Sequence, residues 1–239
     1  MPFQPEHESF SDQPPATATV WRYMDLARYL SLLENEALHF AQADAMSDRL
    51  EGAYGAPNRD RRPAWLTPEI DAMALTVQSR MRSWFRNHAY LNCWHLGEYE
   101  SAARWDIYQR EGRGVAIRST WGSLTASITD PRPIFGARVK YVDYTSTFIP
   151  EDNNFDAYVH KRLSFEHEKE VRLAALLEAE SKSPSAVVPI SVNLSTLIQS
   201  VYIAPDAPSW VADTIESVSN RYPYNINVLQ SDLASDPLK

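Results

Sequence analysis

The stretch at 165–172 concentrates the side chains of this sequence that are best suited to chemistry. It reads Phe-Glu-His-Glu-Lys-Glu-Val-Arg, so three carboxylates, a histidine and two cations occupy eight positions directly before the apolar run 173–177. Carboxylates that lie close together repel one another, which raises the pKa of at least one unless a cation such as Arg172 compensates. The stretch is therefore either a solvated edge or a polar site built into the fold.

Periodicity gives this charged stretch two interpretations. As a helix it would pair Glu168 with Arg172 at i,i+4 on a solvated face. Glu166 and Glu170 would then lie close together and repel each other. As a strand it would place the three glutamates and Arg172 on one face, with apolar positions on the other. Charge runs are usually solvated, so the residues alone favour an exposed edge. The strand interpretation is the one that predicts a site.

Composition and charge limit the classes of protein to consider. The chain has 239 residues, 44% of them hydrophobic, which is enough for one domain with a sizeable core. A net charge of −8 and a pI near 5.3 argue against general nucleic-acid binding. Arg59, Arg61 and Arg62 are the one candidate for a local basic site. A single cysteine excludes an internal disulfide and fits a reducing compartment.

The two ends of the chain differ in composition from the rest. Residues 1–19 collect Pro, Gln, Ser, Asp and Glu without the basic start and apolar centre of a signal peptide. We expect a disordered arm there, a single domain over 20–230 and a flexible tail over 231–239. No stretch reaches the roughly 18 apolar residues that a membrane span needs. The expected location is the cytoplasm.

Hydrophobic periodicity predicts alternating strands and helices in the domain. Strands are expected at 20–24, 37–41, 90–94, 114–117, 137–144, 171–177, 187–192, 200–203 and 226–229. Helices are expected after a cap at Asp25, from Thr67, and at 101–108, 154–163 and 209–219, whereas 52–63 should be a loop. The helix that starts at Thr67 carries one apolar stripe, formed by Ile70, Met73, Val77, Met81 and Trp84. This pattern predicts an α+β domain with a mixed sheet flanked by helices.

Most familiar chemical motifs are absent. The chain has only seven glycines, and Gly112-Arg113-Gly114 lacks the third glycine and the preceding strand of a dinucleotide-binding loop. The histidines have no partner at zinc-ligand spacing, so no metal site is expected. Cys93 stands two residues before His95, but a lone cysteine is most often a small buried residue.

An ordered set of short motifs runs from Trp21 to Pro205. The motifs are Trp21-Arg22-Tyr23-Met24, Asp48-Arg49-Leu50-Glu51-Gly52, Cys93-Trp94 with Trp105 and Tyr108, Gly114-Val115-Ala116-Ile117, and 161–165 leading into Glu168-Lys169-Glu170-Val171-Arg172. Together they resemble an uncharacterised bacterial family, domain of unknown function 2971, which implies a single α+β domain without an established reaction.

A more remote likeness is to ADP-ribosyltransferases of the arginine, serine, glutamate type, which implies a split central sheet and NAD as the substrate. These enzymes place an arginine on the first core strand, a serine on a second strand and a Glu-x-Glu pair at a later strand. By this likeness Arg22 would hold the NAD phosphates, and Glu170 would bond the nicotinamide ribose and stabilise the oxocarbenium-like transition state. Glu168 would orient the nucleophile of the acceptor.

The serine of that pattern has no clear counterpart. His95 stands where it is expected, and Ser119 is an alternative that matches the order of the motifs less well. His95 is either a hydrogen-bonding substitute that binds the cofactor or a structural histidine. Arg22 is either a phosphate ligand or a partner of a carboxylate, and Tyr23 either stacks on nicotinamide or forms a wall of the pocket.

Three classes of function follow from these residues. The first is an NAD-dependent ADP-ribosyltransferase-like protein that transfers ADP-ribose to an unknown acceptor, as a toxin or a defence effector. The second is a module of the same fold that binds a nucleotide without turnover. The third is an interaction protein that uses an exposed patch of its seven tryptophans. The expected partners are a nucleotide and a macromolecular acceptor, without a membrane.

Overall fold

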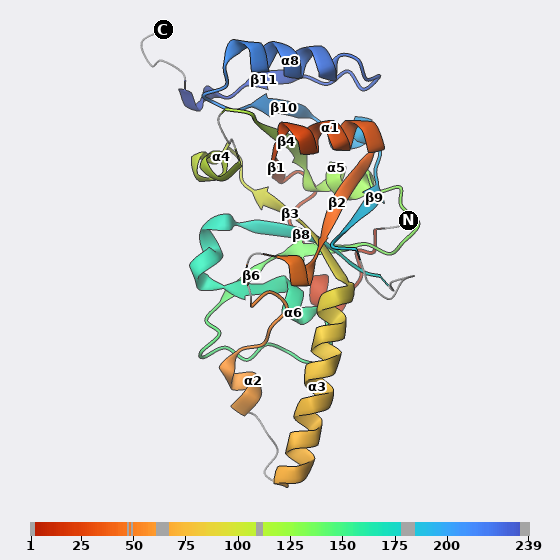
Figure 1. Ribbon diagram of the computed structural model, residues 1–239, viewed down its shortest axis with the longest axis vertical. Coiled ribbons are helices and arrows are strands. Elements are labelled where there is room, and N and C mark those ends of the chain that lie inside the picture. Colours follow the sequence, from red (N-terminus) through yellow and green to blue (C-terminus); the bar gives the residue numbers. More distant parts are fainter. Residues whose placement is uncertain are drawn as a thin grey trace.

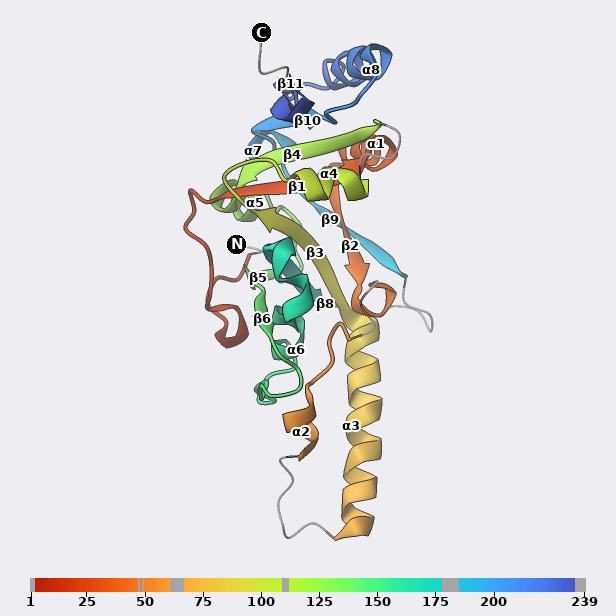
Figure 2. The same cartoon turned by 90° about the vertical axis from the view of Figure 1, so that its left-hand side faces the viewer.

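One large β-sheet runs through the middle of the molecule, and helices lie on its faces and at its ends (Figure 1, Figure 2). The structure is a computed structural model that describes residues 3–46, 48, 50–60, 67–108, 112–177 and 185–234. The predicted α+β class, a mixed sheet flanked by helices, is confirmed. No helix within the described ranges is long and apolar enough to cross a membrane.

The strands form a nine-stranded sheet with the order β11-β10-β4-β1-β3-β2-β9, and β8 joins it by pairing with β3 and β5. Only β10 and β11 are parallel, and a separate parallel pair is formed by β6 and β7. The strands are β1 (Thr19–Asp25), β2 (Ala37–Gln42), β3 (Ala89–Leu96), β4 (Gly114–Thr120), β5 (Phe135–Arg138), β6 (Lys140–Val142), β7 (His160–Arg162), β8 (Glu170–Leu176), β9 (Val187–Ser191), β10 (Ser200–Ile203) and β11 (Val228–Gln230).

The helices differ widely in length and start at the residues that cap them. Asp25 accepts a hydrogen bond from the Arg28 N–H at 2.8 Å, and Thr67 caps the longest helix, as predicted. The α-helices are α1 (Leu26–Asn35), α2 (Ala56–Asp60), α3 (Pro68–His88), α4 (Ala102–Tyr108), α5 (Trp121–Ala126), α6 (Asp156–Val159), α7 (Leu194–Leu197) and α8 (Ser209–Ser219).

The sheet is split along one edge of β3. β1 pairs with the end of β3, where Trp21 lies opposite His95, and β2 pairs with its start, where Ala41 lies opposite Leu91. Between these two pairings, no strand of the described chain lies beside residues 92–94 on that edge. β8 covers the opposite edge along the whole length of β3. The split is therefore a local gap between β1 and β2, with β3 as its floor.

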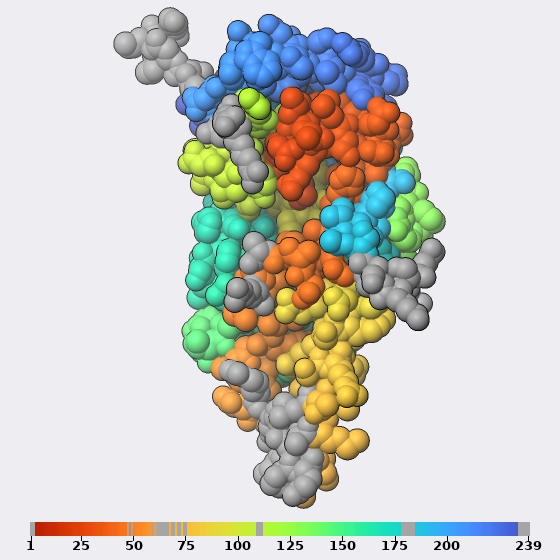
Figure 3. All heavy atoms as spheres, viewed as in Figure 1, coloured from red at the N-terminus to blue at the C-terminus, as the bar shows by residue number. Residues whose placement is uncertain are grey.

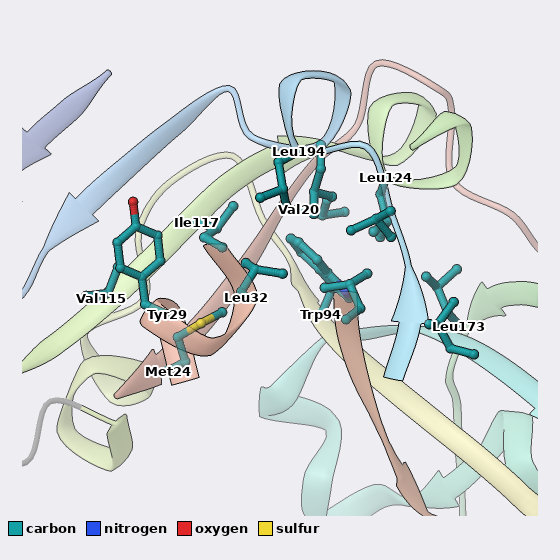
Figure 4. Close-up of a cluster of buried hydrophobic side chains, with 14 of the residues drawn as sticks. Val20, Met24, Tyr29, Leu32, Trp94, Val115, Ile117, Leu124, Leu173 and Leu194 are labelled. Carbon is teal, nitrogen blue, oxygen red and sulfur yellow. The ribbon is translucent and has the colours of Figure 1, made fainter. Parts of the chain in front are cut away.

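The main hydrophobic core packs on the sheet beside this gap (Figure 4). Val20 of β1 and Trp94 of β3 are buried there, and α1 contributes Tyr29 and Leu32. Figure 4 shows these side chains with Leu173 of β8 in one cluster that bridges the strands. Burial of such side chains contributes about 1.5–3 kcal/mol each, which holds the strands around the gap in place.

The charged stretch is neither a regular α-helix nor a continuous strand. Leu163–Glu168 is a short 3-10 helix, Lys169 adopts a left-handed conformation with φ 43°, and β8 begins only at Glu170. The strand interpretation is thus wrong for Glu166 and Glu168 but holds for Glu170 and Arg172. The reversal at Lys169 lets Glu168 approach the site from outside the sheet.

Three other predicted elements differ in detail from the structure. The predicted loop 52–63 contains α2, and the predicted helix 154–163 is the short α6 followed by β7. The predicted strand 137–144 is two strands, β5 and β6, which pair with different partners. Backbone pairing with strands remote in sequence decided these cases, and local periodicity cannot report it.

The apolar stripe of α3 does not face the core. α3 projects from one end of the body, where it forms the narrow end of the molecule, and its apolar side chains are 43–72% exposed (Figure 1, Figure 3). These side chains are Ile70, Met73, Val77, Met81 and Trp84. The predicted helix and its stripe are present, but the stripe lies on the surface.

The N-terminal segment packs on the domain, although its composition predicts disorder. Phe10 is fully buried, and its ring lies 5.4 Å from that of Phe135 and 5.1 Å from that of Phe155. His7 adds a ring to the same cluster. Pro, Gln and Ser predict a lack of core residues, yet the aromatic rings of this segment pack against the domain. Of the predicted tail, 231–234 is described, and 235–239 lie outside the described residues.

Replacing Phe10 with alanine should lower the free energy of unfolding by about 3–5 kcal/mol, because a buried aromatic ring is lost and a cavity remains. Tyr99→Ala is the matched control, since Tyr99 is 77% exposed. Urea denaturation followed by circular dichroism measures both changes. Equal stability of Phe10→Ala and the wild type would show that the segment does not dock.

Candidate functional site

A cavity of about 230 Å³ opens at the gap between β1 and β2. A smaller hollow of about 60 Å³ adjoins it and shares Arg22, Tyr23, Arg28 and Tyr108 with it. The residues that line the larger cavity are Trp21, Arg22, Tyr23, Arg28, Ala41, Met46, Leu91, Cys93, Trp94, His95, Arg104, Tyr108, Lys161, Glu168 and Glu170. All five predicted site residues, Arg22, Tyr23, His95, Glu168 and Glu170, are among them.

Strand register explains part of this convergence. Trp21 lies opposite His95, and His95 lies opposite Glu170, so one row crosses β1, β3 and β8. Directly opposed residues of antiparallel strands project from the same face of a sheet. His95 and Glu170 therefore reach the cavity from the floor of the gap.

Arg22 enters the gap from β1. Its guanidinium donates a hydrogen bond to the Cys93 carbonyl, which has no strand neighbour on that side. Burial lowers the pKa of Arg22 from its ordinary value, although an arginine stays charged at neutral pH. Among the described residues, no carboxylate forms an ion pair with it. A charged fork without a counter-ion, facing a cavity, is suited to bind an anion.

Tyr23 forms a fixed wall of the cavity. Its hydroxyl oxygen accepts a hydrogen bond from the Ser101 backbone N–H at 2.7 Å, and its ring meets Trp105 edge-on at 5.0 Å. Burial raises the pKa of Tyr23 to about 12, so the phenol is neutral. These contacts hold the ring in one orientation beside Arg22.

His95 is neutral and has a defined tautomer. Its Nδ1 lies 2.8 Å from the Glu168 carbonyl oxygen, which can only accept, so Nδ1 carries the proton. Burial lowers the pKa of His95, and Nε2 is left as an acceptor. A Cβ at Gly97 would come within 2.9 Å of Nε2, so the glycine leaves room beside this nitrogen.

Glu170 is buried and ionised. Burial alone would raise its pKa, but Arg172, Lys161 and other polar neighbours lower it to about 2. Arg172 Nε and Nη2 donate to Oε2 at 3.0 and 2.8 Å. Oε1 lies 3.5 Å from Lys161 Nζ, a side chain that also lines the cavity. The carboxylate therefore keeps its charge in a site where burial opposes it.

The pKa of Glu168 shifts in the opposite direction, upwards. Burial and the charge of Glu170 raise its pKa, although its ion pair with Lys161 works against this. Of the two neighbouring carboxyl groups, Glu168 is therefore the one that takes up a proton more readily. Neighbouring carboxyls with separated pKa values are typical of acid and base pairs.

Sequence reasoning missed two cations of the site. Arg104 of α4 donates to the Glu168 carbonyl at 2.9 Å and lies 3.8 Å from Glu170 Oε1. Lys161 bonds Glu168 and approaches Glu170. Lys161 begins one of the motifs of the family resemblance, at 161–165, whereas nothing in the sequence around Arg104 distinguishes it from a surface residue. Four cations face two carboxyls here, so the cavity is positive in a chain of net charge −8.

Neither Ser119, the alternative to the expected serine, nor the thiol of Cys93 suits a role in the site. Ser119 is buried in β4 and donates its hydroxyl to the Leu197 carbonyl at 2.5 Å, and it does not line the cavity. Burial raises the pKa of the Cys93 thiol to about 11, so it stays protonated.

Within the described ranges, no group of three His, Cys, Asp or Glu side chains could hold a metal ion. The predicted basic site stays a prediction, because Arg61 and Arg62 lie outside the described residues, while Arg59 is in α2.

Comparison with known proteins gives a structural likeness. No family model and no curated protein matches the chain, so the resemblance to family 2971 stays a prediction. Among solved structures, the chain is similar to Thermus sp. 2.9 DarT in complex with ADP-ribosylated ssDNA, with 9% identity and a TM-score of 0.41. The alignment covers 91% of this chain and 96% of that one. At this score the likeness carries no argument, and the interpretation rests on the side chains of the cavity.

The low pKa of Glu170 predicts a pH dependence of stability. The folded value, about 2, lies below the ordinary value of 4.5, so the charge stabilises the fold above pH 4.5 and this contribution is lost as the pH falls towards 2. The difference in unfolding free energy between wild type and Glu170→Gln should shrink by on the order of 3 kcal/mol over that range. Guanidinium denaturation at a series of pH values measures it. A difference that is constant with pH would contradict the assignment.

Proposed function

We propose that this protein is an NAD-consuming ADP-ribosyltransferase that transfers ADP-ribose to an acceptor still to be identified. The observation that carries the proposal is the convergence of Arg22, His95, Glu168 and Glu170 on one cavity at the split of the sheet. These are the residues that chain order assigned to the arginine, serine and Glu-x-Glu positions of such enzymes. Residues from three strands remote in sequence meet in one place, as the proposal requires.

Arg22 supplies the group that binds the NAD pyrophosphate. Its fork lies half-buried without a carboxylate partner in the described chain, and a diphosphate offers paired oxygens that match it. Arg28 lines the same cavity at its more exposed side, where it also forms an ion pair with Asp25. The positive cavity then compensates the two negative charges of the pyrophosphate.

Glu170 supplies the charge that the reaction needs. The bond between C1′ of the ribose and the nicotinamide nitrogen breaks, and its electron pair leaves with neutral nicotinamide. The sugar becomes oxocarbenium-like, and a nearby carboxylate stabilises this positive charge. Glu170 stays ionised throughout, because its pKa is held far below neutral pH.

Glu168 and His95 complete the reaction site. The acceptor nucleophile forms a new bond with C1′ and gives up a proton, and Glu168 is the adjacent carboxyl group with the higher pKa. His95 presents Nε2 as an acceptor, which suits an amide N–H of nicotinamide. In this role His95 replaces the serine of the enzymes that the chain resembles.

A specific observation favours a second candidate, a module that binds a nucleotide without turnover. Glu170 is already engaged by Arg172, Lys161 and Arg104, so a substrate hydroxyl must compete with these cations. The third class, an interaction protein with a patch of tryptophans, has less support. Four tryptophans are buried, Trp84 and Trp210 lie on helices at opposite ends of the molecule, and Trp65 is outside the described residues (Figure 1).

Nicotinamide release from NAD tests the proposed reaction. The wild type should release nicotinamide, and Glu170→Gln should reduce the rate by at least about 100-fold, because the stabilising charge is lost. Glu166→Gln is the matched control, since Glu166 lies in the same charged stretch but does not line the cavity. Chromatography of the reaction products measures release. No release by the wild type would exclude the enzyme, and NAD binding without release would identify the binding module.

Binding of NAD tests the role of Arg22. Arg22→Lys keeps the charge but loses the fork, and should raise the Kd for NAD by about 10- to 100-fold, since a hydrogen bond to a charged group is worth about 1.5–3 kcal/mol. Arg221→Lys, at an exposed position after α8, is the control. Isothermal titration calorimetry gives both affinities. Equal weakening by the two variants would argue against a phosphate site at Arg22.

A further inference from the structure

We propose that Glu51 is a positioning residue for Glu170 and acts through Arg172. The inference rests on the proposed function, because it identifies what holds the carboxylate proposed to stabilise the transition state. It also assigns a purpose to the motif around Asp48 and Gly52, which the proposed reaction does not use. Glu51 itself does not line the cavity.

Arg172 is a fully buried guanidinium with every N–H satisfied. Nη1 donates to Glu51 Oε1 at 2.6 Å and to the Tyr158 carbonyl at 2.9 Å. Nη2 donates to Glu51 Oε2 at 3.1 Å and to Glu170 Oε2 at 2.8 Å, and Nε donates to the same oxygen at 3.0 Å. An arginine has five N–H donors, so this set leaves no alternative orientation for the group.

The arrangement distinguishes the two oxygens of Glu170. Oε2 receives both bonds from the side edge of Arg172, whereas Oε1 is left beside Lys161 and Arg104, which line the cavity. Oε1 is therefore the oxygen that can meet a substrate hydroxyl. The selection depends on Glu51, because Glu51 occupies the end of the guanidinium fork that binds a carboxylate through two oxygens.

Without Glu51, the fork would be free to bind Glu170. A carboxylate prefers the two parallel bonds of a bidentate pair, so Glu170 would turn both oxygens to Arg172 and withdraw Oε1 from the cavity. A purely structural ion pair would need only one buried carboxylate. The second one adds a cost of desolvation that a positioning role explains.

A turn carries Glu51 into place. Asp48 accepts the Leu50 N–H at 3.0 Å and binds Arg162 at 2.7 Å, which closes the turn and ties it to the body. Gly52 follows with φ +69°, and a Cβ there would lie 2.4 Å from the ring of Tyr158. The turn is thus wedged against the same residue whose carbonyl binds Arg172.

Kinetics of nicotinamide release separate positioning from stability. Glu51→Gln should lower kcat by about 100-fold with KM for NAD little changed, because displacement of a reacting group by about 1 Å costs this much while binding is retained. Glu51→Asp should recover part of the loss. Asp130→Asn is the matched control, because Asp130 is also a buried carboxylate that binds an arginine, Arg132, but it does not line the cavity. It should leave kcat near the wild-type value. Equal losses in Glu51→Gln and Asp130→Asn, in folded proteins, would overturn the proposal.

A carboxyl titration tests the same inference without activity. In protein labelled with 13C at glutamate side-chain carboxyls, the Glu170 signal is the one absent from Glu170→Gln. Glu51→Gln should shift this signal, and the control Asp130→Asn should not. The double variant Glu51→Gln/Arg172→Gln removes both members of the Glu51–Arg172 ion pair, so neither is left as an unpaired buried charge. It should raise the titration midpoint of Glu170 by about one to three pH units.

The two measurements fail in different ways. A wild type that releases no nicotinamide defeats the proposed function, while the titration still decides whether Glu51 and Arg172 hold Glu170. An unshifted Glu170 signal in Glu51→Gln, or an unchanged midpoint in the double variant, defeats the positioning role even if the enzyme is active.

Discussion

The structure depends on one interruption of backbone pairing. β3 has strand neighbours at both ends of one edge but none in the described chain beside residues 92–94. A buried carbonyl needs a hydrogen-bond partner, and Arg22 provides one for Cys93 by extending its side chain into the gap. The same side chain thus repairs the sheet and brings a cation into the cavity. A complete pairing of β1 with β3 would have removed both the space and the need for an arginine.

Charge is balanced locally in this site and not over the whole chain. The protein is acidic, yet its cavity gathers four cations around two carboxyls. Arg172, beside the cavity, together with Lys161 and Arg104 keeps Glu170 ionised, and the charge of Glu170 in turn helps to raise the pKa of Glu168. The pKa values of two glutamates in one short motif therefore shift in opposite directions because they face different neighbours. A Glu-x-Glu motif alone does not contain this information, since Arg104 and Lys161 reach the pair from α4 and β7.

Much of the fold and of the candidate site could be predicted from local patterns. Asp25 and Thr67 predict helix starts through their side-chain oxygens, and α8 has the predicted bounds because its apolar period is regular. The five site residues followed from chain order and do meet in one cavity. Features that depend on tertiary contacts could not be predicted. The left-handed Lys169, the docking of Phe10 and the ion pair of Glu51 with Arg172 each involve a partner remote in sequence or a backbone reversal without a glycine signal.

The row of Trp21, His95 and Glu170 also has a consequence for how the protein folds. β1, β3 and β8 are separated by long stretches of chain, yet they must lie side by side before any of these side chains can meet. Pairings of this kind close large loops of chain. The chain loses conformational entropy before the new contacts compensate for it, so these strand pairings form late and slowly. The cavity is complete only once these three strands are paired. A nascent chain still lacking β8 has no site, which would keep the proposed activity silent until synthesis is well advanced.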